Sequence, residues 1–192
     1  MFIQVMQAKC SRPDDVRKFA DSYDNAGAVG LLGGTFGVTD DGEFLGIIRF
    51  ESAEAAAANS ARPETDAWAQ EFATYLDGPV SFADYDDVSQ FLDGGSDSAG
   101  FVQVIRGTTS DVAAAKALMA DTGSLKEMRP EILGGTFAVA ADGSFTQTVY
   151  FTDEASARNG EQQEPPAEVR EAIEALMAGS SFFDLRNPWF ES

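Results

Sequence analysis

The chain carries the pentapeptide LGGTF twice, at residues 32–36 and again at residues 133–137. In both copies an Asp-Gly pair follows at the same interval, as Asp41-Gly42 and as Asp142-Gly143. Apolar residues alternate with others around each pair, and Asp-Gly between two such runs is the strongest short-range signal for a β-hairpin. The sequence therefore predicts the same hairpin twice.

The similarity continues on both sides of the hairpin. Upstream, the strand-like run at residues 2–9 resembles the run that begins at Phe101, and downstream Ser81-Phe82 recurs as Ser181-Phe182. The second copy has two more residues between its first helix and its second strand, a place where loops tolerate changes in length. Self-similarity over this length indicates an internal duplication.

Each copy predicts the order strand, helix, hairpin, helix, strand. The first helix begins near Ser11, and the alanine-rich second helix begins near Ala53. Pro63 interrupts the second helix because proline disfavours helical backbone in the residue before it, and Pro165-Pro166 has the same effect in the second copy. This order is ferredoxin-like, an α+β fold in which both helices cover one face of an antiparallel sheet. The strands expected in the first copy are residues 2–9, 32–39, 43–51 and 80–86.

The pattern divides the chain into a first ferredoxin-like repeat at residues 1–92, a linker at 93–100 and a second repeat at 101–192. The linker is assigned from its glycine, serine and aspartate content. Trp189 and Phe190 lie beyond the last expected strand, where they either cover an apolar opening or form an exposed docking peptide.

Both faces of the expected sheet are apolar. In the third strand Phe44, Ile48 and Phe50 point to one face, and Leu45 and Ile47 point to the other. The helices cover only one face, so the second must pack on something. We expect the two sheets to pair face to face into an α/β barrel within one chain, which acts as a monomeric pseudo-dimer or forms a homodimer.

Composition excludes several classes of function. Acidic residues outnumber basic ones 32 to 13, and a net charge of −19 repels phosphate backbones and anionic lipids, so we expect no nucleic-acid or membrane partner. The chain has no histidine and one cysteine, which removes histidine-based catalysis and the usual metal sites, and we expect no metal and no cofactor. The lone thiol and the absence of a signal-peptide pattern favour a cytoplasmic location.

With these features the sequence resembles the dimeric α/β-barrel superfamily, here as a tandem duplication. The resemblance rests on the element order, the Gly-Gly-Thr-Phe strand entry, the Asp-Gly hairpin and the interrupted helix at residues 59–68. It implies a barrel of two ferredoxin-like units. The superfamily includes cofactor-independent monooxygenases, isomerases, haem enzymes and proteins of unknown role. Its haem members bind iron through histidine, which this chain lacks.

Four residues of the first repeat are candidates for a ligand site. Arg49 stands on an otherwise apolar strand, where it either holds a carboxylate or enolate or simply reaches solvent. Trp68, Phe72 and Tyr75 form one stripe of a helix, which is either core or the wall of a pocket with the Tyr75 hydroxyl as a donor. The second copy lacks these aromatic residues, so the first copy is the better candidate.

Asn59 and Arg62 lie at the helix interruption and complete the candidate ligand-binding set. Asn59 recurs as Asn159, and either it ends the first helical segment or it binds a ligand. No acid-base pair stands out, so the sequence names no catalytic residue and does not decide whether the protein is an enzyme.

The main hypothesis for function is binding of a small hydrophobic or aromatic molecule in repeat 1. The first alternative is a non-catalytic interaction or assembly module whose barrel is filled by side chains, which the fifteen phenylalanines favour. The second alternative is a cofactor-independent monooxygenase or isomerase.

Overall fold

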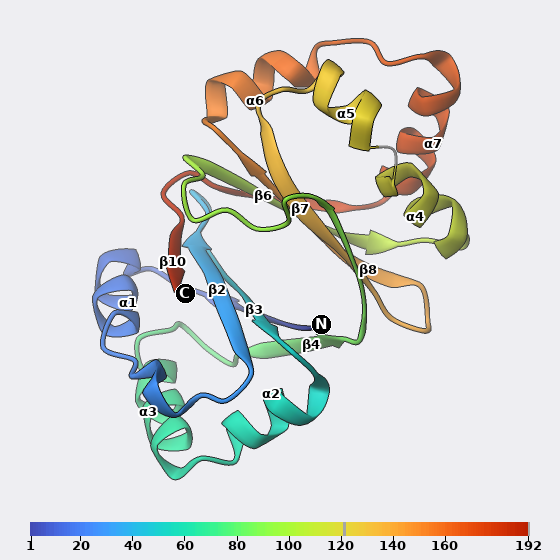
Figure 1. The fold of residues 1–192 in the computed structure, drawn as a ribbon. Coiled ribbons are helices and arrows are strands. Elements are labelled where there is room, and N and C mark those ends of the chain that lie inside the picture. The colour runs from blue at the N-terminus through green and yellow to red at the C-terminus, as the bar shows by residue number, and fades with distance from the viewer. Residues whose placement is uncertain (121, 192) are drawn as a thin grey trace. The chain divides into compact units, whose positions relative to one another are not determined.

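The computed structural model describes residues 1–120 and 122–191 (Figure 1). It divides into two compact units. Unit 1 is Met1–Asp86 together with the C-terminal residues from Asn187, and unit 2 is Asp87–Arg186. Each unit contains an antiparallel five-stranded sheet with helices packed on it, which confirms the α+β class and the two ferredoxin-like repeats.

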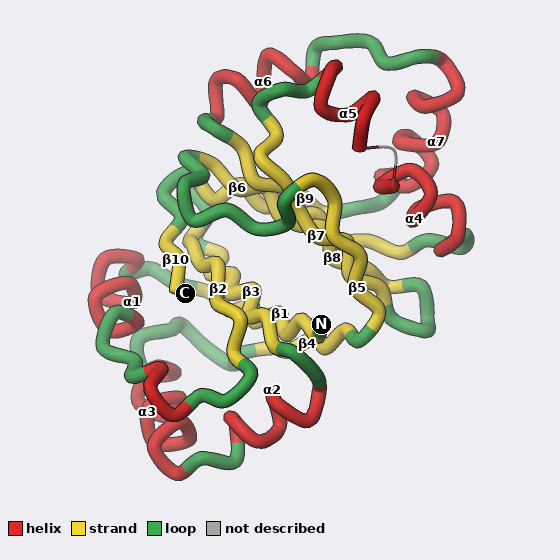
Figure 2. The backbone as a smooth tube through the Cα atoms, in the orientation of Figure 1, coloured by secondary structure: helices red, strands yellow, loops and turns green. Residues whose placement is uncertain are grey.

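Unit 1 has the strand order β10-β2-β3-β1-β4. Its helices pack on the sheet and on one another (Figure 2). Its strands are β1 (Phe2–Lys9), β2 (Leu31–Val38), β3 (Glu43–Phe50), β4 (Ser81–Tyr85) and β10 (Trp189–Glu191). Its helices are α1 (Pro13–Ala20), α2 (Ala53–Ser60) and α3 (Pro63–Ala73), with a short 3-10 helix, η1 (Asn25–Gly27).

Unit 2 repeats this arrangement with the order β5-β7-β8-β6-β9. The two residues added in the second copy fall where helix α5 replaces η1. Its strands are β5 (Asp87–Leu92), β6 (Phe101–Thr108), β7 (Ile132–Val139), β8 (Ser144–Phe151) and β9 (Ser181–Leu185). Its helices are α4 (Val112–Ala120), α5 (Thr122–Met128), α6 (Glu154–Glu161) and α7 (Ala167–Met177).

Local sequence explains the turns and caps. Gly42 and Gly143 adopt φ values of +79° and +84°, the left-handed backbone that the Asp-Gly hairpins require. Helix α2 begins after Ser52, whose hydroxyl accepts a hydrogen bond from the backbone N–H of Ala55 at 3.2 Å. Arg62 is extended before Pro63, which separates α2 from α3 as expected.

Two short strands depart from the expected pattern. Residues 87–92, expected at the end of repeat 1, form β5 and pair with β7 of unit 2. The C-terminal residues 189–191 form β10 and pair with β2 of unit 1. Each ferredoxin-like sheet thus gains a fifth strand from the chain segment that follows the other repeat. Trp189 is 6% exposed, so the tail is an edge strand and not an exposed docking peptide.

The barrel expected from the sequence is not closed by strand pairing. Within the described residues the ladders form two separate five-stranded sheets, and no ladder joins one sheet to the other. In unit 1, β10 pairs with β2 and forms one edge of the sheet, and β4 forms the other edge. In unit 2, β5 pairs with β7 in the same way, and β9 forms the other edge. Closing a barrel would need a hydrogen-bonded ladder between an edge of one sheet and an edge of the other. Instead, the short strands β10 and β5 form one edge of each sheet.

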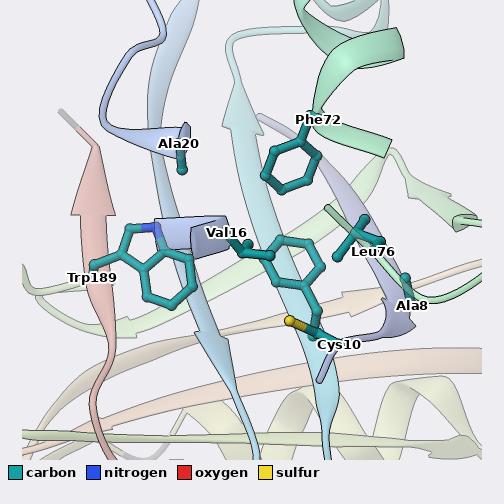
Figure 3. Close-up of a cluster of buried hydrophobic side chains, with 8 residues drawn as sticks. Ala8, Cys10, Val16, Ala20, Phe72, Leu76 and Trp189 are labelled. Atoms are coloured by element: carbon teal, nitrogen blue, oxygen red, sulfur yellow. The ribbon is translucent and has the colours of Figure 1, made fainter. Parts of the chain in front are cut away.

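The core of unit 1 joins residues from distant parts of the chain. Figure 3 shows Trp189 of β10 and Phe72 of α3 facing one cluster with Val16 of α1 and Cys10. Phe44 lies in the same cluster, 5.5 Å from Phe72 and 6.3 Å from Trp189 between ring centroids. The C-terminal strand is therefore part of the core of the N-terminal repeat.

Unit 2 has two apolar clusters on its sheet. One contains Phe137 and Phe145, and the other contains Phe91, Phe101 and Phe151. No helix in the described part of the chain is both long enough and apolar enough to cross a membrane.

Candidate functional site

A cavity of about 290 Å³ lies in unit 1 between the sheet and the helices. The sheet supplies one wall, and α3, α2 and the end of α1 supply the other. Aromatic and aliphatic side chains make up most of the lining. From the strands come Gln4, Met6, Leu31, Gly34, Phe36, Ile48, Phe50, Phe82 and Glu191. From the helices and the segment after α1 come Ala20, Tyr23, Asn59, Ser60, Thr65, Asp66, Trp68, Ala69 and Phe72.

Three polar side chains meet at the helical side of the cavity and are called here the polar cluster: Tyr23, Asn59 and Thr65. The Tyr23 hydroxyl donates to Asn59 Oδ1 at 3.2 Å and lies 3.1 Å from Thr65 Oγ1. Asn59 is only 8% exposed, and its Oδ1 also accepts from Arg62 Nη1 at 3.3 Å. Because buried polar groups need partners, this network holds the Tyr23 hydroxyl in place.

Trp68 forms a rigid aromatic wall. Its ring stacks on Phe72 with centroids 4.8 Å apart and on Phe19 at 5.4 Å, and it meets the edge of Tyr23 at 4.9 Å. The indole N–H donates to the Ser22 hydroxyl at 3.4 Å. Packing on three rings leaves the Trp68 side chain little freedom, so the wall is formed before any ligand arrives.

The structure brings three of the predicted site residues together at the cavity: Asn59, Trp68 and Phe72. Tyr75 does not line it. Its ring stacks on Phe19 at 4.7 Å, and the Arg12 guanidinium lies 5.7 Å from its centroid.

The two predicted arginines also lie outside the lining. Arg62 pairs with Glu64, with Nη2 and Oε1 2.9 Å apart, and reaches the cavity only through its bond to Asn59. Arg49 is the strand residue between Ile48 and Phe50, which both line the cavity, so its side chain points to the opposite face of the sheet.

Sequence reasoning missed Tyr23, Thr65, Gln4 and Glu191. Tyr23 and Thr65 reach the site only because the segment after α1 packs beside α3, which no local pattern reveals. Gln4 is an ordinary alternating strand residue whose amide donates to Asp84 at 3.0 Å. Glu191 belongs to β10, a strand of three residues that has no distinctive pattern in the sequence.

The equivalent place in unit 2 is filled by side chains. Glu191 pairs with Gly34 in β2, and at the same position of the other sheet Phe91 pairs with Gly135. Phe91 is 2% exposed and packs in an apolar cluster. A Cβ on Gly135 would lie 2.1 Å from Cζ of Phe91, so the ring rests directly on the glycine backbone.

The starts of the two helices show that Asn59 and Asn159 are not equivalent positions of the two repeats. Helix α2 begins after Ser52 and α6 begins after Asp153, so the position of Asn59 corresponds to Gly160 and not to Asn159. Gly160 is buried, whereas Asn159 is exposed. A Cβ on Gly160 would lie 2.0 Å from Oε1 of Glu131 and 2.3 Å from Nε of Arg129, so this ion pair fills the space that the Asn59 amide occupies in unit 1.

The charged groups of the cavity are acidic. Asp66 and Glu191 line it, and no lysine or arginine is among the lining residues that the structure describes. Asp66 accepts a hydrogen bond from the Gln70 amide at 2.9 Å. In the described part of the chain no group of three Cys, Asp or Glu side chains is placed to hold a metal ion.

A wider hollow of about 450 Å³ lies where β1 ends beside the β2–β3 hairpin. Lys9, Cys10, Asp41 and Asp77 are among its lining residues. The Cys10 thiol is 3% exposed, and burial raises its pKa. A buried, protonated thiol is a poor nucleophile, so this hollow offers less chemistry than the aromatic cavity.

Known proteins match this chain by fold and not by sequence. No family model and no curated protein matches the sequence. A protein from Lactobacillus acidophilus NCFM, provisionally named a monooxygenase, matches with a TM-score of 0.74 at 11% identity, over 98% of this chain and 95% of that one. An anthrone oxidase-like protein matches with a TM-score of 0.67 at 13% identity, over 99% of this chain and 89% of that one.

A major regulator of staphylococcal pathogenesis has a similar fold, with a TM-score of 0.58 at 10% identity over 96% of this chain and 98% of that one. Proteins with different named roles therefore share this architecture, and the likeness defines the fold alone. The chain shares with these proteins a fold of two tandem ferredoxin-like repeats, as expected from the sequence.

Proposed function

We propose that unit 1 binds a small aromatic molecule in the cavity between its sheet and α3. The observation that carries this proposal is the aromatic wall of Trp68 and Phe72 next to the polar cluster of Tyr23, Asn59 and Thr65. Apolar cavities of this size with a few convergent polar groups are typical ligand sites.

The arrangement favours a flat ligand with one oxygen. Its ring would stack on Trp68, and Phe36 would bound it on the sheet side. Its carbonyl or hydroxyl group would exchange a hydrogen bond with the polar cluster. A ligand with polar groups at both ends fits less well, because the remaining wall is mostly apolar and would leave the second group without partners.

Isothermal titration calorimetry with 1-naphthalenemethanol, a neutral two-ring alcohol, tests the proposal. We expect saturable binding with one site per chain, weakened about tenfold or more in Trp68→Ala because stacking of the ligand ring on the indole and the burial of its aromatic surface are lost. The matched control is Phe182→Ala, which removes an exposed aromatic side chain from unit 2 and should leave affinity unchanged. Equal weakening in both variants would refute binding at the cavity.

Oxidation without a cofactor is a second candidate function, favoured by the names of two structural neighbours, a provisional monooxygenase and an anthrone oxidase-like protein. Anthrone serves as the probe, since with O₂ it gives anthraquinone and water. Its ring system suits the aromatic wall, and its carbonyl suits the polar cluster, which would stabilise the enolate formed when a solvent base removes a proton from the ring carbon opposite the carbonyl.

Oxygen consumption with anthrone separates the two candidates. Uptake above the uncatalysed rate that falls at least tenfold in Tyr23→Phe supports oxidation. Binding without uptake supports the binding function alone, which is compatible with the regulator among the structural neighbours.

A further inference from the structure

We propose that the cavity discriminates by charge, accepting neutral and cationic aromatic molecules and rejecting aromatic carboxylates, and that Glu191 is the specificity-determining residue. The inference rests on the proposed function, since it names the class of ligand for the same cavity.

The first observation is the charge of the lining. Two carboxylates, those of Asp66 and Glu191, line the cavity, and no lysine or arginine does so among the described lining residues. Arg62 binds Asn59 from outside the lining and forms an ion pair with Glu64. Arg49 lies beside the backbone of Glu191, since a Cβ on Gly33 would meet both Arg49 Nη2 and the Glu191 carbonyl oxygen, but its side chain starts from the opposite face of the sheet. A carboxylate ligand would therefore enter an apolar, acidic space with no partner of opposite charge.

The second observation is the direction of the Glu191 side chain. Alternate residues of a strand share a face, so Glu191 lies on the face of Trp189, which is buried in the core between sheet and helices. At the same position of the other sheet, Phe91 is buried in its own core. The fifth strand thus directs this side chain into the layer between sheet and helices, and in unit 1 the side chain is a carboxylate.

The third step concerns the strength of charge–charge interactions inside the cavity. Two charges a few ångströms apart interact several times more strongly beside an apolar wall than in bulk water. A carboxylate ligand is repelled in such a place, and an ammonium ligand is attracted. We expect a difference in affinity of about tenfold or more between them. Any partner of the Glu191 carboxylate contributes to the field that the ligand meets, so the size of the discrimination measures the net charge at this position.

Calorimetric titration with three ligands of one shape measures this discrimination: 1-naphthalenemethanol, 1-naphthylmethylammonium and 1-naphthoate. The measurement is made in 0.15 M salt, where the long-range field of the whole chain is largely screened. We expect the alcohol and the ammonium ion to bind, and the carboxylate to bind at least about tenfold more weakly than the ammonium ion.

Variants then identify the residue responsible. Glu191→Gln should reduce the gap between ammonium and carboxylate several-fold while the affinity for the alcohol stays within about twofold. Glu168→Gln, on the exposed surface of α7, changes the net charge equally and should leave the gap unchanged. Asp66→Asn tests the other lining carboxylate and should have the smaller effect.

The outcomes are distinct. Naphthoate binding as tightly as the ammonium ion would overturn the charge preference and leave the aromatic site standing. A preference that persists in Glu191→Gln, or that falls equally in Glu168→Gln, would overturn the role of Glu191. Failure of all three ligands to bind would overturn the site itself, and this inference with it.

Discussion

Glu191 and Phe91 occupy the same position in the fifth strands of the two sheets, each opposite the second glycine of the repeated Gly-Gly pair. In unit 2 the phenylalanine ring lies on Gly135 and fills the space between sheet and helices. In unit 1 Glu191 stands opposite Gly34, the Phe36 ring lies over that glycine, and all three residues line the cavity. Changes at a few positions after the duplication therefore give the two units different side chains at this place, with a cavity beside it in unit 1.

This relationship predicts that Glu191→Phe closes the cavity of unit 1. We expect binding of 1-naphthalenemethanol to be lost, because the new ring would occupy cavity space beside Phe36 that the ligand needs. The free energy of unfolding should change by less than about 1 kcal/mol, since filling a cavity offsets any strain in β10. Calorimetry and chemical denaturation measure the two effects. Undiminished binding would show that the ligand lies elsewhere.

The buried amide of Asn59 supports both the fold and the polar cluster. Asn59→Ala removes the acceptor for Tyr23 and for Arg62, and should lower the free energy of unfolding by about 1–3 kcal/mol. Asn159→Ala is the matched control, because Asn159 is exposed on α6 and its loss should cost less than about 0.5 kcal/mol. Denaturant titration checks both values, and equal effects would argue against the corrected helix register.

The C-terminal strand should be required for the stability of unit 1. Trp189 lies 6.1 Å from Phe36 between ring centroids, and Arg17 lies over its ring at 5.8 Å. Trp189→Ala should lower the free energy of unfolding by about 3 kcal/mol. Deleting the chain from Asn187 should in addition free the β2 edge and promote self-association, which sedimentation velocity detects. A monomeric, fully stable truncated chain would contradict this role of β10.

Stability should fall in acid partly through Glu154. A hydrogen bond from Arg186 Nε at 2.8 Å and the charges of Arg186 and Arg158 lower the pKa of its carboxyl group. A lowered folded-state pKa adds stability that is complete above the unfolded-state value, about 4.3 for glutamate, and is lost as pH falls through the folded-state pKa. Thermal melts from pH 7 to pH 3 should therefore show a smaller acid loss in Glu154→Gln than in the wild type. Identical pH profiles of the variant and the wild type would refute a contribution of Glu154 to the loss of stability in acid.

The sequence predicted the fold because its signals are local and occur twice. The Asp-Gly hairpins, the proline between α2 and α3, and the alternating strands each act within a few residues, and the duplication confirms each one by its copy. The exchange of β5 and β10 escaped prediction because a strand of three to six residues has no distinctive pattern until its partner edge is known. The expectation of a barrel rested on the apolar faces of the strands, which do not reveal that short added strands take the sheet edges and leave the barrel unclosed by strand pairing.

The candidate site was predicted in part. Trp68 and Phe72 could be found from helical spacing, which also places Tyr75 nearby but cannot distinguish a ring at the cavity from one stacked on Phe19. Arg49 was predicted as a site residue because it is a charge on an apolar strand. Strand alternation places its side chain on the face opposite to those of Ile48 and Phe50, which line the cavity. Tyr23 and Glu191 come from segments brought in by tertiary packing, which a single sequence does not encode locally.

A crystal structure of the protein soaked with 4-bromo-1-naphthalenemethanol, at a concentration that calorimetry shows to be saturating, tests the central claim most directly. The account predicts an anomalous bromine peak inside unit 1 between Trp68 and Phe36, with the ligand hydroxyl within hydrogen-bonding distance of Tyr23 or Asn59. A bromine peak only in unit 2 or on an outer surface, with the cavity empty, would contradict it.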